Sequence, residues 1–138
     1  MVNVMGYLKI GELAKATETS VETLRYYEAE GLIPAPRRSD GGYRLYSAED
    51  EQRVHFIRRA RSMGFSLKEV LELLTLQVEK QASTCGEVKV LAQLKLVAID
   101  EKIAELNKMK TALQQITDAC SGGDEPAVHC SILSALEH

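Results

Sequence analysis

Three cysteines are the residues of this chain best suited to chemistry, and two of them lie at opposite ends of one segment. From Cys85 to Cys120 the sequence contains no proline and one glycine, Gly86, at its start. A helix rises 1.5 Å per residue, so a continuous helix here separates the two sulfur atoms by roughly 50 Å. One chain therefore cannot use both thiols at a single site. An antiparallel partner helix would bring Cys85 of one subunit beside Cys120 and Cys130 of the other.

These thiols predict a site for a soft or borderline divalent metal ion. Thiolates favour zinc, cadmium, lead, mercury and copper(I) over magnesium and calcium, which prefer oxygen. His129 is adjacent to Cys130 and is the candidate fourth ligand, because zinc prefers four ligands in a tetrahedron. Lead or mercury would accept three sulfurs. An odd number of cysteines also leaves a redox switch as an alternative, in which Cys120 and Cys130 form a disulfide.

The composition excludes several classes of protein. Of the 138 residues, 45% are hydrophobic and 27% are charged, which is ordinary for a globular chain. No apolar run approaches the length of a membrane helix, and the N-terminus lacks the basic and apolar segments of a signal peptide. No arrangement of residues indicates an active site. We therefore expect a cytoplasmic protein that is not an enzyme and has no membrane partner.

Positive charge is concentrated in the N-terminal half, although the net charge is −3. All eight arginines lie between Arg25 and Arg61, whereas residues 77–138 carry six lysines and nine acids. Guanidinium groups match phosphate oxygens and guanine edges. The distribution predicts a nucleic-acid-binding face, with a solvated surface as the alternative.

Two short helices are predicted near the N-terminus, and together they form a candidate helix-turn-helix. Residues 9–17 form the first, and Ser20 is a suitable N-cap for the second. We expect Tyr26 to be part of the core. The second helix leaves three side chains available for contacts outside the core: Thr23, Arg25 and Tyr27.

A two-stranded wing is predicted to follow. Prolines at positions 34 and 36 oppose a helix, and the DGG sequence at 40–42 is typical of a tight hairpin turn. The flanking strands carry Arg37 and Arg38 on one side and Arg44 on the other, so the hairpin would present basic side chains to a phosphate backbone.

The remaining elements are helices. One is expected over residues 47–64, and Ser66 with Glu69 forms a capping box that begins another. From Cys85 onward an apolar seam recurs at alternating steps of four and three residues, which predicts a coiled-coil homodimer. The seam consists of Ala92, Leu96, Ile99, Ile103, Leu106, Lys110, Leu113 and Thr117. A loop and a last helix over 131–136 follow Cys120.

Six short motifs resemble, in order, those of the MerR family of metal-responsive transcriptional regulators. They are KIGELAK at 9–15, TLRYYE at 23–28, GLI at 31–33, GYRLY at 42–46, FIR at 56–58 and MGFSL at 63–67. Cys85 and the sequence around Cys130 are most similar to the zinc-responsive branch of that family, or to its cadmium and lead sensors. Those zinc-responsive proteins have a second cysteine directly after the first loop cysteine. Here Ser121 follows Cys120, so a two-zinc cluster is not expected.

The resemblance implies a mainly α fold. Residues 7–76 would form a winged helix-turn-helix DNA-binding domain and 77–84 a linker. Residues 85–120 would form a long antiparallel coiled-coil dimerisation helix, and 121–138 a short metal-binding loop and C-terminal helix.

The resemblance also implies a mechanism. The homodimer binds double-stranded promoter DNA shared with RNA polymerase, and metal binding makes it bend and untwist that DNA so that transcription starts. The implied DNA contacts, chiefly to phosphates, are Thr23, Arg25, Tyr27, Arg38, Arg44 and Arg61. The implied metal ligands are Cys85, Cys120, Cys130 and His129, with zinc as the first candidate ion and cadmium, lead or mercury as others. A thiol redox-sensing regulator and a mercury sensor of the same family are the alternatives.

Overall fold

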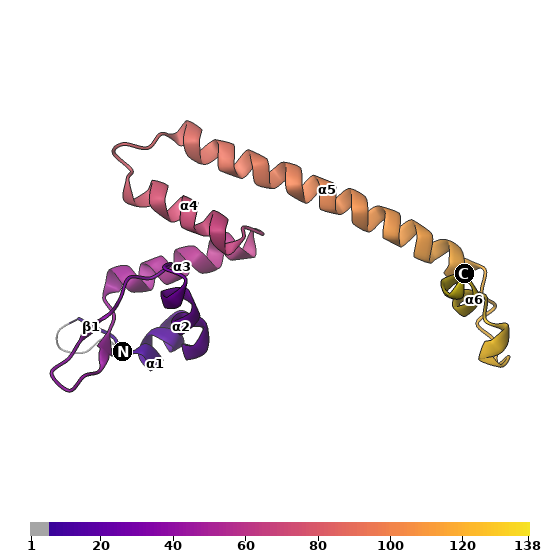
Figure 1. Ribbon diagram of the computed structural model, residues 1–138, viewed down its shortest axis with the longest axis horizontal. Helices are drawn as coiled ribbons and strands as arrows, with labels where there is room; N and C mark the ends of the chain where they lie inside the picture. The colour runs from indigo at the N-terminus through magenta and orange to yellow at the C-terminus, as the bar shows by residue number, and fades with distance from the viewer. Residues whose placement is uncertain (1–5) are drawn as a thin grey trace. The chain divides into compact units, whose positions relative to one another are not determined.

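The computed structural model describes residues 6–138, which are mainly helical (Figure 1). In chain order the elements are α1 (Ile10–Ala16), α2 (Val21–Ala29), β1 (Arg37–Arg38), β2 (Arg44–Leu45), α3 (Ala48–Ser62), α4 (Leu67–Val78), α5 (Cys85–Asp118), the 3-10 helix η1 (Ala127–His129) and α6 (Ser131–Glu137). The chain divides into two compact units between Ala92 and Gln93. The helices, the two-stranded hairpin and the long helix α5 are those that the sequence predicts.

Serine side chains determine where three helices begin. Ser20, Ser47 and Ser66 cap α2, α3 and α4, and each accepts a hydrogen bond from the backbone N–H three residues later. At α4 the bond from Glu69 N to Ser66 Oγ is 3.2 Å long, and the Glu69 carboxylate accepts from Ser66 N at 2.7 Å. Each such cap contributes about 1 kcal/mol. The predicted capping box is therefore present.

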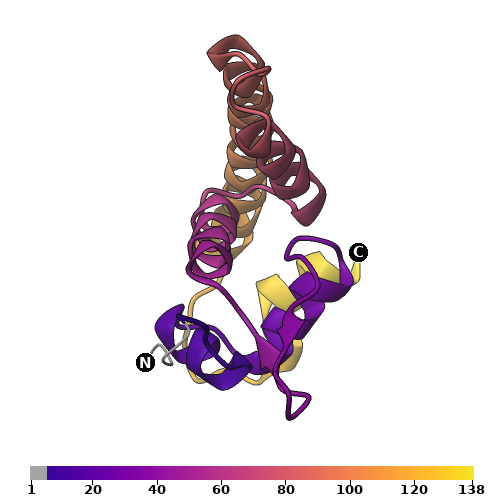
Figure 2. The ribbon, with the colours of Figure 1, turned by 90° about the vertical axis from the view of Figure 1, so that its left-hand side faces the viewer.

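The hairpin is short and closes through a glycine. β1 and β2 are antiparallel, with Arg38 opposite Arg44. Gly42 has φ of 82°, in the left-handed region that favours glycine, and its N–H donates to Ser39 O at 2.9 Å. Within the first unit the hairpin projects beyond the helices (Figure 2), so its arginines are accessible to a partner.

The hydrophobic core of the first unit is formed by α1 to α4 and the segments that join them. Leu8 and Tyr46 tie the start of the described chain to the hairpin, with reciprocal backbone hydrogen bonds of 2.7 and 2.8 Å. The most buried apolar side chains are Leu8, Leu13, Leu24, Leu32, Ile33, Tyr46, Val54, Ile57, Val70 and Leu74. Burial of one such side chain contributes roughly 1.5–3 kcal/mol. This core fixes α2 and the hairpin in one unit.

The burial of the two adjacent tyrosines of α2 is the reverse of what we expected from the sequence. Tyr27 is 9% exposed and packs in the core, whereas Tyr26 is 50% exposed. Tyr27 follows the buried Leu24 by three residues, which places both on one face of the helix. The expectation that Tyr26 is buried is wrong, and the burial of Tyr27 counts against the DNA contact predicted for it.

Helix α5 is unbroken over 34 residues but buries none of its side chains within one chain. Leu96, Ile103 and Leu106 of the predicted seam are 60%, 50% and 62% exposed. The helix ends at Asp118, two residues before Cys120, and α4 extends to Val78, so two residues of the expected linker are helical. Among the helices of residues 6–138, none has the length and apolar character needed to cross a membrane.

Candidate functional site

Three of the arginines predicted to contact DNA line one surface hollow of the first unit. Arg25 comes from α2, Arg38 from β1 and Arg44 from β2, and Lys9 lines the same hollow of about 550 Å³. The fold thus brings together cations from the helix-turn-helix and the wing. Such a group of cations can bind the phosphates of a nucleic-acid backbone. We refer to Lys9, Arg25, Arg38 and Arg44 as the basic hollow.

Glu28 fixes one of these arginines. The Nη1 atom of Arg44 lies 3.4 Å from Oε2 of Glu28, and the hydroxyl of Tyr46 donates to the same oxygen at 3.0 Å. Burial, and then the carboxylate of Glu28, raise the pKa of Tyr46 above its ordinary value, so this hydroxyl stays protonated and donates. Glu28 therefore connects β2 to α2. No local sequence signal identifies this role, because the partners are 16 and 18 residues away.

Arg38, Arg61 and Thr23, which are also predicted DNA contacts, each make a hydrogen bond within the chain. Arg38 belongs to the basic hollow and donates from Nη1 to Gly42 O at 3.0 Å, which orients it within the hairpin. Arg61 does not line the hollow and donates to Phe65 O at 3.0 Å. The hydroxyl of Thr23 accepts from Ser20 Oγ at 2.8 Å, as part of the cap of α2.

Two residues that the sequence reasoning missed also line the hollow. The ammonium group of Lys9 lies 4.5 Å from the ring centroid of Tyr43, and Tyr43 is 60% exposed. A cation over an aromatic face is a favourable contact that keeps the ammonium group at the surface. In the GYRLY motif Tyr43 lies between the turn glycine Gly42 and Arg44, and this position is the sequence signal that could have identified it.

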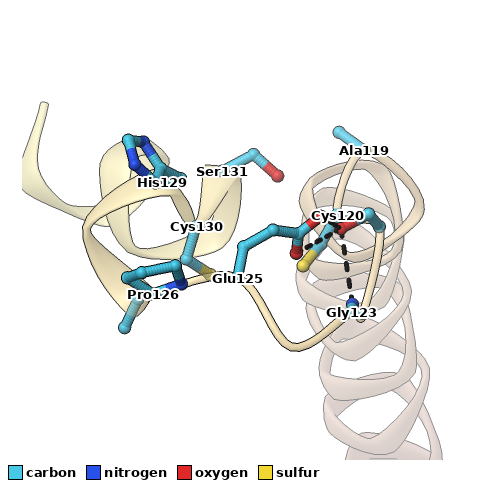
Figure 3. A pocket seen from close by; sticks show the side chains of 11 residues that line it. Ala119, Cys120, Gly123, Glu125, Pro126, His129, Cys130 and Ser131 are labelled. Atoms are coloured by element: carbon cyan, nitrogen blue, oxygen red, sulfur yellow. Dashed lines mark hydrogen bonds between the residues drawn. The ribbon is translucent and has the colours of Figure 1, made fainter.

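The second unit holds two of the three cysteines side by side. Cys120 lies just beyond α5, and Cys130 caps α6. Both line a hollow of about 400 Å³ (Figure 3). The intervening loop turns back at Gly122, whose φ is 71°.

The local backbone favours the thiolate form of Cys130. The N–H groups of Leu133 and then Ile132 donate to its sulfur and lower its pKa below the ordinary value, with a further contribution from the Cys120 thiol. Desolvation opposes this shift; it is smaller than either backbone contribution but larger than that of the Cys120 thiol. The thiolate is the form of cysteine that binds metals.

The remaining predicted ligands are less directly placed. His129 lines the same hollow, but in Figure 3 its ring points away from the two cysteine side chains. Cys85 is exposed at the head of α5 in the first unit, where it lines an apolar hollow with Phe56 and Leu73. Within residues 6–138 no three His, Cys, Asp or Glu side chains are grouped so as to hold a metal ion. One chain therefore assembles only part of the predicted site.

The donor atoms of the hollow nevertheless suit a thiophilic ion. Two cysteine side chains line it, and the pKa of Cys130 is lowered, which favours its thiolate form. The hydroxyl of Ser131 also lines the hollow and is buried, and it has no hydrogen-bond partner in the described part of the chain. A buried polar atom without a partner marks a network that a further group completes. The hollow fits a metal ion that takes its remaining ligands from elsewhere.

Comparison with known proteins gives two matching family models. The model described as "MerR HTH family regulatory protein" matches residues 8–77, and the one described as "MerR, DNA binding" matches residues 51–116. The matched residues include the basic hollow and most of α5.

Individual proteins match over nearly the whole chain. The HTH-type transcriptional regulator ZntR of Escherichia coli K12 is 45% identical over 129 residues, covering 94% of this chain and 92% of that protein. A probable heavy metal-dependent transcriptional regulator of Haemophilus influenzae is 42% identical, covering 94% and 98%. The crystal structure of the transcription regulator PbrR691 from Ralstonia metallidurans in complex with lead(II) has a TM-score of 0.80 and 36% identity, covering 94% and 98%.

Proposed function

Since the chain belongs to the MerR family of transcriptional regulators, we propose that it is a homodimeric activator that responds to a divalent thiophilic metal ion. The family is one of regulators, so the expectation that the chain is not an enzyme is confirmed. In this proposal residues 7–76 bind DNA, 77–84 form a linker, 85–120 form the dimer and 121–138 bind the metal. The placement of Cys120 and Cys130 in one hollow is the observation that supports the metal response.

DNA binding rests on the basic hollow. Arg25, Arg38 and Arg44 converge there, which supports their proposed role as phosphate contacts. Thr23, Tyr27 and Arg61 are proposed as further DNA contacts, although Tyr27 is largely buried and none of the three lines the hollow. Promoter DNA shared with RNA polymerase is the proposed partner, as the family resemblance implies.

Dimer formation rests on the exposed apolar stripe of α5. An amphipathic helix gains stability by covering such a stripe, and a second copy of α5 carries the same one. A helix of 34 residues is about 50 Å long, so an antiparallel pair would place the head of each helix beside the end of the other. Cys85 of one subunit would then lie near Cys120 and Cys130 of its partner.

The proposed metal site takes Cys85 from one subunit and Cys120 with Cys130 from the other. A bound ion would supply the positive centre that joins thiolates of two subunits. Zinc is the first candidate and cadmium, lead or mercury are others, because all accept thiolate ligands. We propose that this bridge favours the dimer conformation that bends and untwists promoter DNA, which lets RNA polymerase start transcription.

The test is transcription from the protein's own promoter, measured in vitro against a panel of divalent ions. We expect activation by zinc, cadmium or lead, and none by magnesium or calcium. The Cys120→Ser variant should bind the promoter but not respond. Activation that is independent of metal, or equal for magnesium and zinc, would refute the proposal.

A thiol redox sensor is the second candidate, and the placement of Cys120 and Cys130 in one hollow favours it. The two candidates differ in how the thiols respond to zinc. If the chain is a metal sensor, zinc protects these thiols from alkylation and reductant does not change activation. If it is a redox sensor, oxidation alone switches transcription in metal-free buffer.

A further inference from the structure

A serine and a glutamate form a clasp across the loop that follows α5. The hydroxyl of Ser121 lies 3.0 and 2.9 Å from the two carboxylate oxygens of Glu125, to which it donates, and it accepts from Gly123 N at 3.4 Å. Ser121 is the residue next to Cys120. The clasp therefore holds a carboxylate beside a proposed metal ligand.

The carboxylate also contacts the loop backbone closely. A β-carbon added at Gly123 would lie only 3.0 Å from Oε2 of Glu125, so a larger residue there would displace the carboxylate. Glu125 lines the same hollow as Cys120 and Cys130. In Figure 3 its side chain extends toward the loop around Cys120, whereas the ring of His129 points away from both cysteines.

The neighbouring acid provides an internal comparison. Asp124 carries the same charge one position earlier in the loop, but it does not line the hollow. Substitutions of Asp124 and Glu125 can therefore distinguish the effect of negative charge in the loop from the effect of a carboxylate in the hollow. From the sequence we expected His129 to be the ligand that is not a thiolate. The geometry favours Glu125 as that ligand instead.

We propose that Glu125 supplies an oxygen ligand that makes the site selective for zinc over softer ions, with Ser121 as the residue that positions it. This inference rests on the proposed function, since it assumes a metal site at Cys120 and Cys130. Zinc accepts carboxylate oxygen together with sulfur in a tetrahedral site, whereas softer ions gain less from oxygen. The Ser121 hydroxyl reaches both oxygens of Glu125, so it could retain one oxygen while the other binds the ion.

The experiment compares zinc and mercury(II) affinities of the full-length protein by competition with chelators of known affinity. Glu125→Gln should weaken zinc binding about 10- to 100-fold, and Ser121→Ala should do so by a smaller factor within that range. Mercury(II) affinity should change less than about threefold in both, because the three thiols that bind it remain. Retained mercury binding also shows that the loop is folded.

Two control variants isolate the carboxylate. Asp124→Asn removes the same charge outside the hollow, and His129→Ala removes the alternative ligand; both should bind zinc like the wild type. If Glu125→Gln matches Asp124→Asn, the inference is overturned while the thiol site stands. If His129→Ala weakens zinc binding and Glu125→Gln does not, the histidine is the ligand instead. If the wild type binds zinc no better than Cys120→Ser does, the proposed function itself fails.

Discussion

The Nη1 atom of Arg44 in the hairpin lies 3.4 Å from the Oε2 atom of Glu28 in α2. This pair connects the wing to the second helix of the helix-turn-helix, 16 residues earlier in the chain. Both side chains are partly exposed, so the pair itself contributes at most about 1 kcal/mol. Its main consequence is geometric, because it holds Arg44 in the same hollow as Arg25.

The basic hollow gives the first prediction. Arg25→Ala and Arg44→Ala should each weaken promoter binding and lower the slope of log affinity against log salt by about one unit, because each removes one phosphate contact. Fluorescence anisotropy with labelled promoter at several salt concentrations measures both. Lys102→Ala, on the exposed surface of α5, is the control and should leave the slope unchanged. Wild-type slopes in both arginine variants would exclude the hollow as a DNA-binding surface.

Tyr46 gives a prediction about stability. Tyr46→Phe removes the hydroxyl that donates to Glu28 and should lower the free energy of unfolding by about 1 kcal/mol, since one partly buried hydrogen bond is lost. Urea denaturation monitored by circular dichroism tests this. Tyr43→Phe, at an exposed ring, is the matched control with little expected effect. Equal stability of the two variants would mean that the Glu28 network is not formed in solution.

The stripe on α5 gives a prediction about assembly. Ile103→Asp should produce monomers that bind the promoter poorly, because a charge is placed within the proposed helix–helix contact. Sedimentation equilibrium reports the oligomeric state. Lys102→Asp introduces the same carboxylate one residue away, outside the seam, and should remain dimeric. A dimeric Ile103→Asp protein would show that the subunits associate through another surface.

The environment of Cys130 gives a prediction about pH. Its pKa is lowered by backbone N–H groups at the start of α6, so its thiolate persists to lower pH than that of an ordinary cysteine. In metal-free protein, the pH midpoint for iodoacetamide alkylation of Cys130, followed by mass spectrometry, should therefore be lower than in the same protein in urea. The unfolded chain loses those hydrogen bonds and serves as the reference. Identical midpoints would mean that α6 does not order around Cys130.

Local patterns predicted most of the fold, and contacts between distant residues explain what they missed. Ser66 with Glu69 and the glycine turn at Gly42 act within a few residues, so the sequence was sufficient for them. Tyr26 and Tyr27 are adjacent, and the three-residue spacing of Tyr27 from the buried Leu24 was a local signal that the sequence expectation did not use.

The candidate site shows the same limit. The cysteines were recognisable from their residue type and spacing, and the structure places Cys120 and Cys130 in one hollow. Glu125 was overlooked because its role depends on a loop conformation that brings its carboxylate onto Ser121. The direction of the His129 ring is likewise set by the loop and not by its position next to Cys130.

The central claim is that each metal site is shared between two subunits. A heterodimer of Cys85→Ser and Cys120→Ser tests it most directly, since one end of that dimer retains all three thiols and the other end lacks two. Homodimers of either variant should bind no ion tightly and should still bind the promoter.

The decisive measurement is the number of zinc ions bound per dimer, determined by mass spectrometry of the intact complex under native conditions. The shared site predicts two for the wild type and one for the heterodimer, with metal-dependent activation partly restored. A heterodimer that binds no zinc, while the wild type binds two, would contradict the shared site and show that the three cysteines do not meet across the dimer.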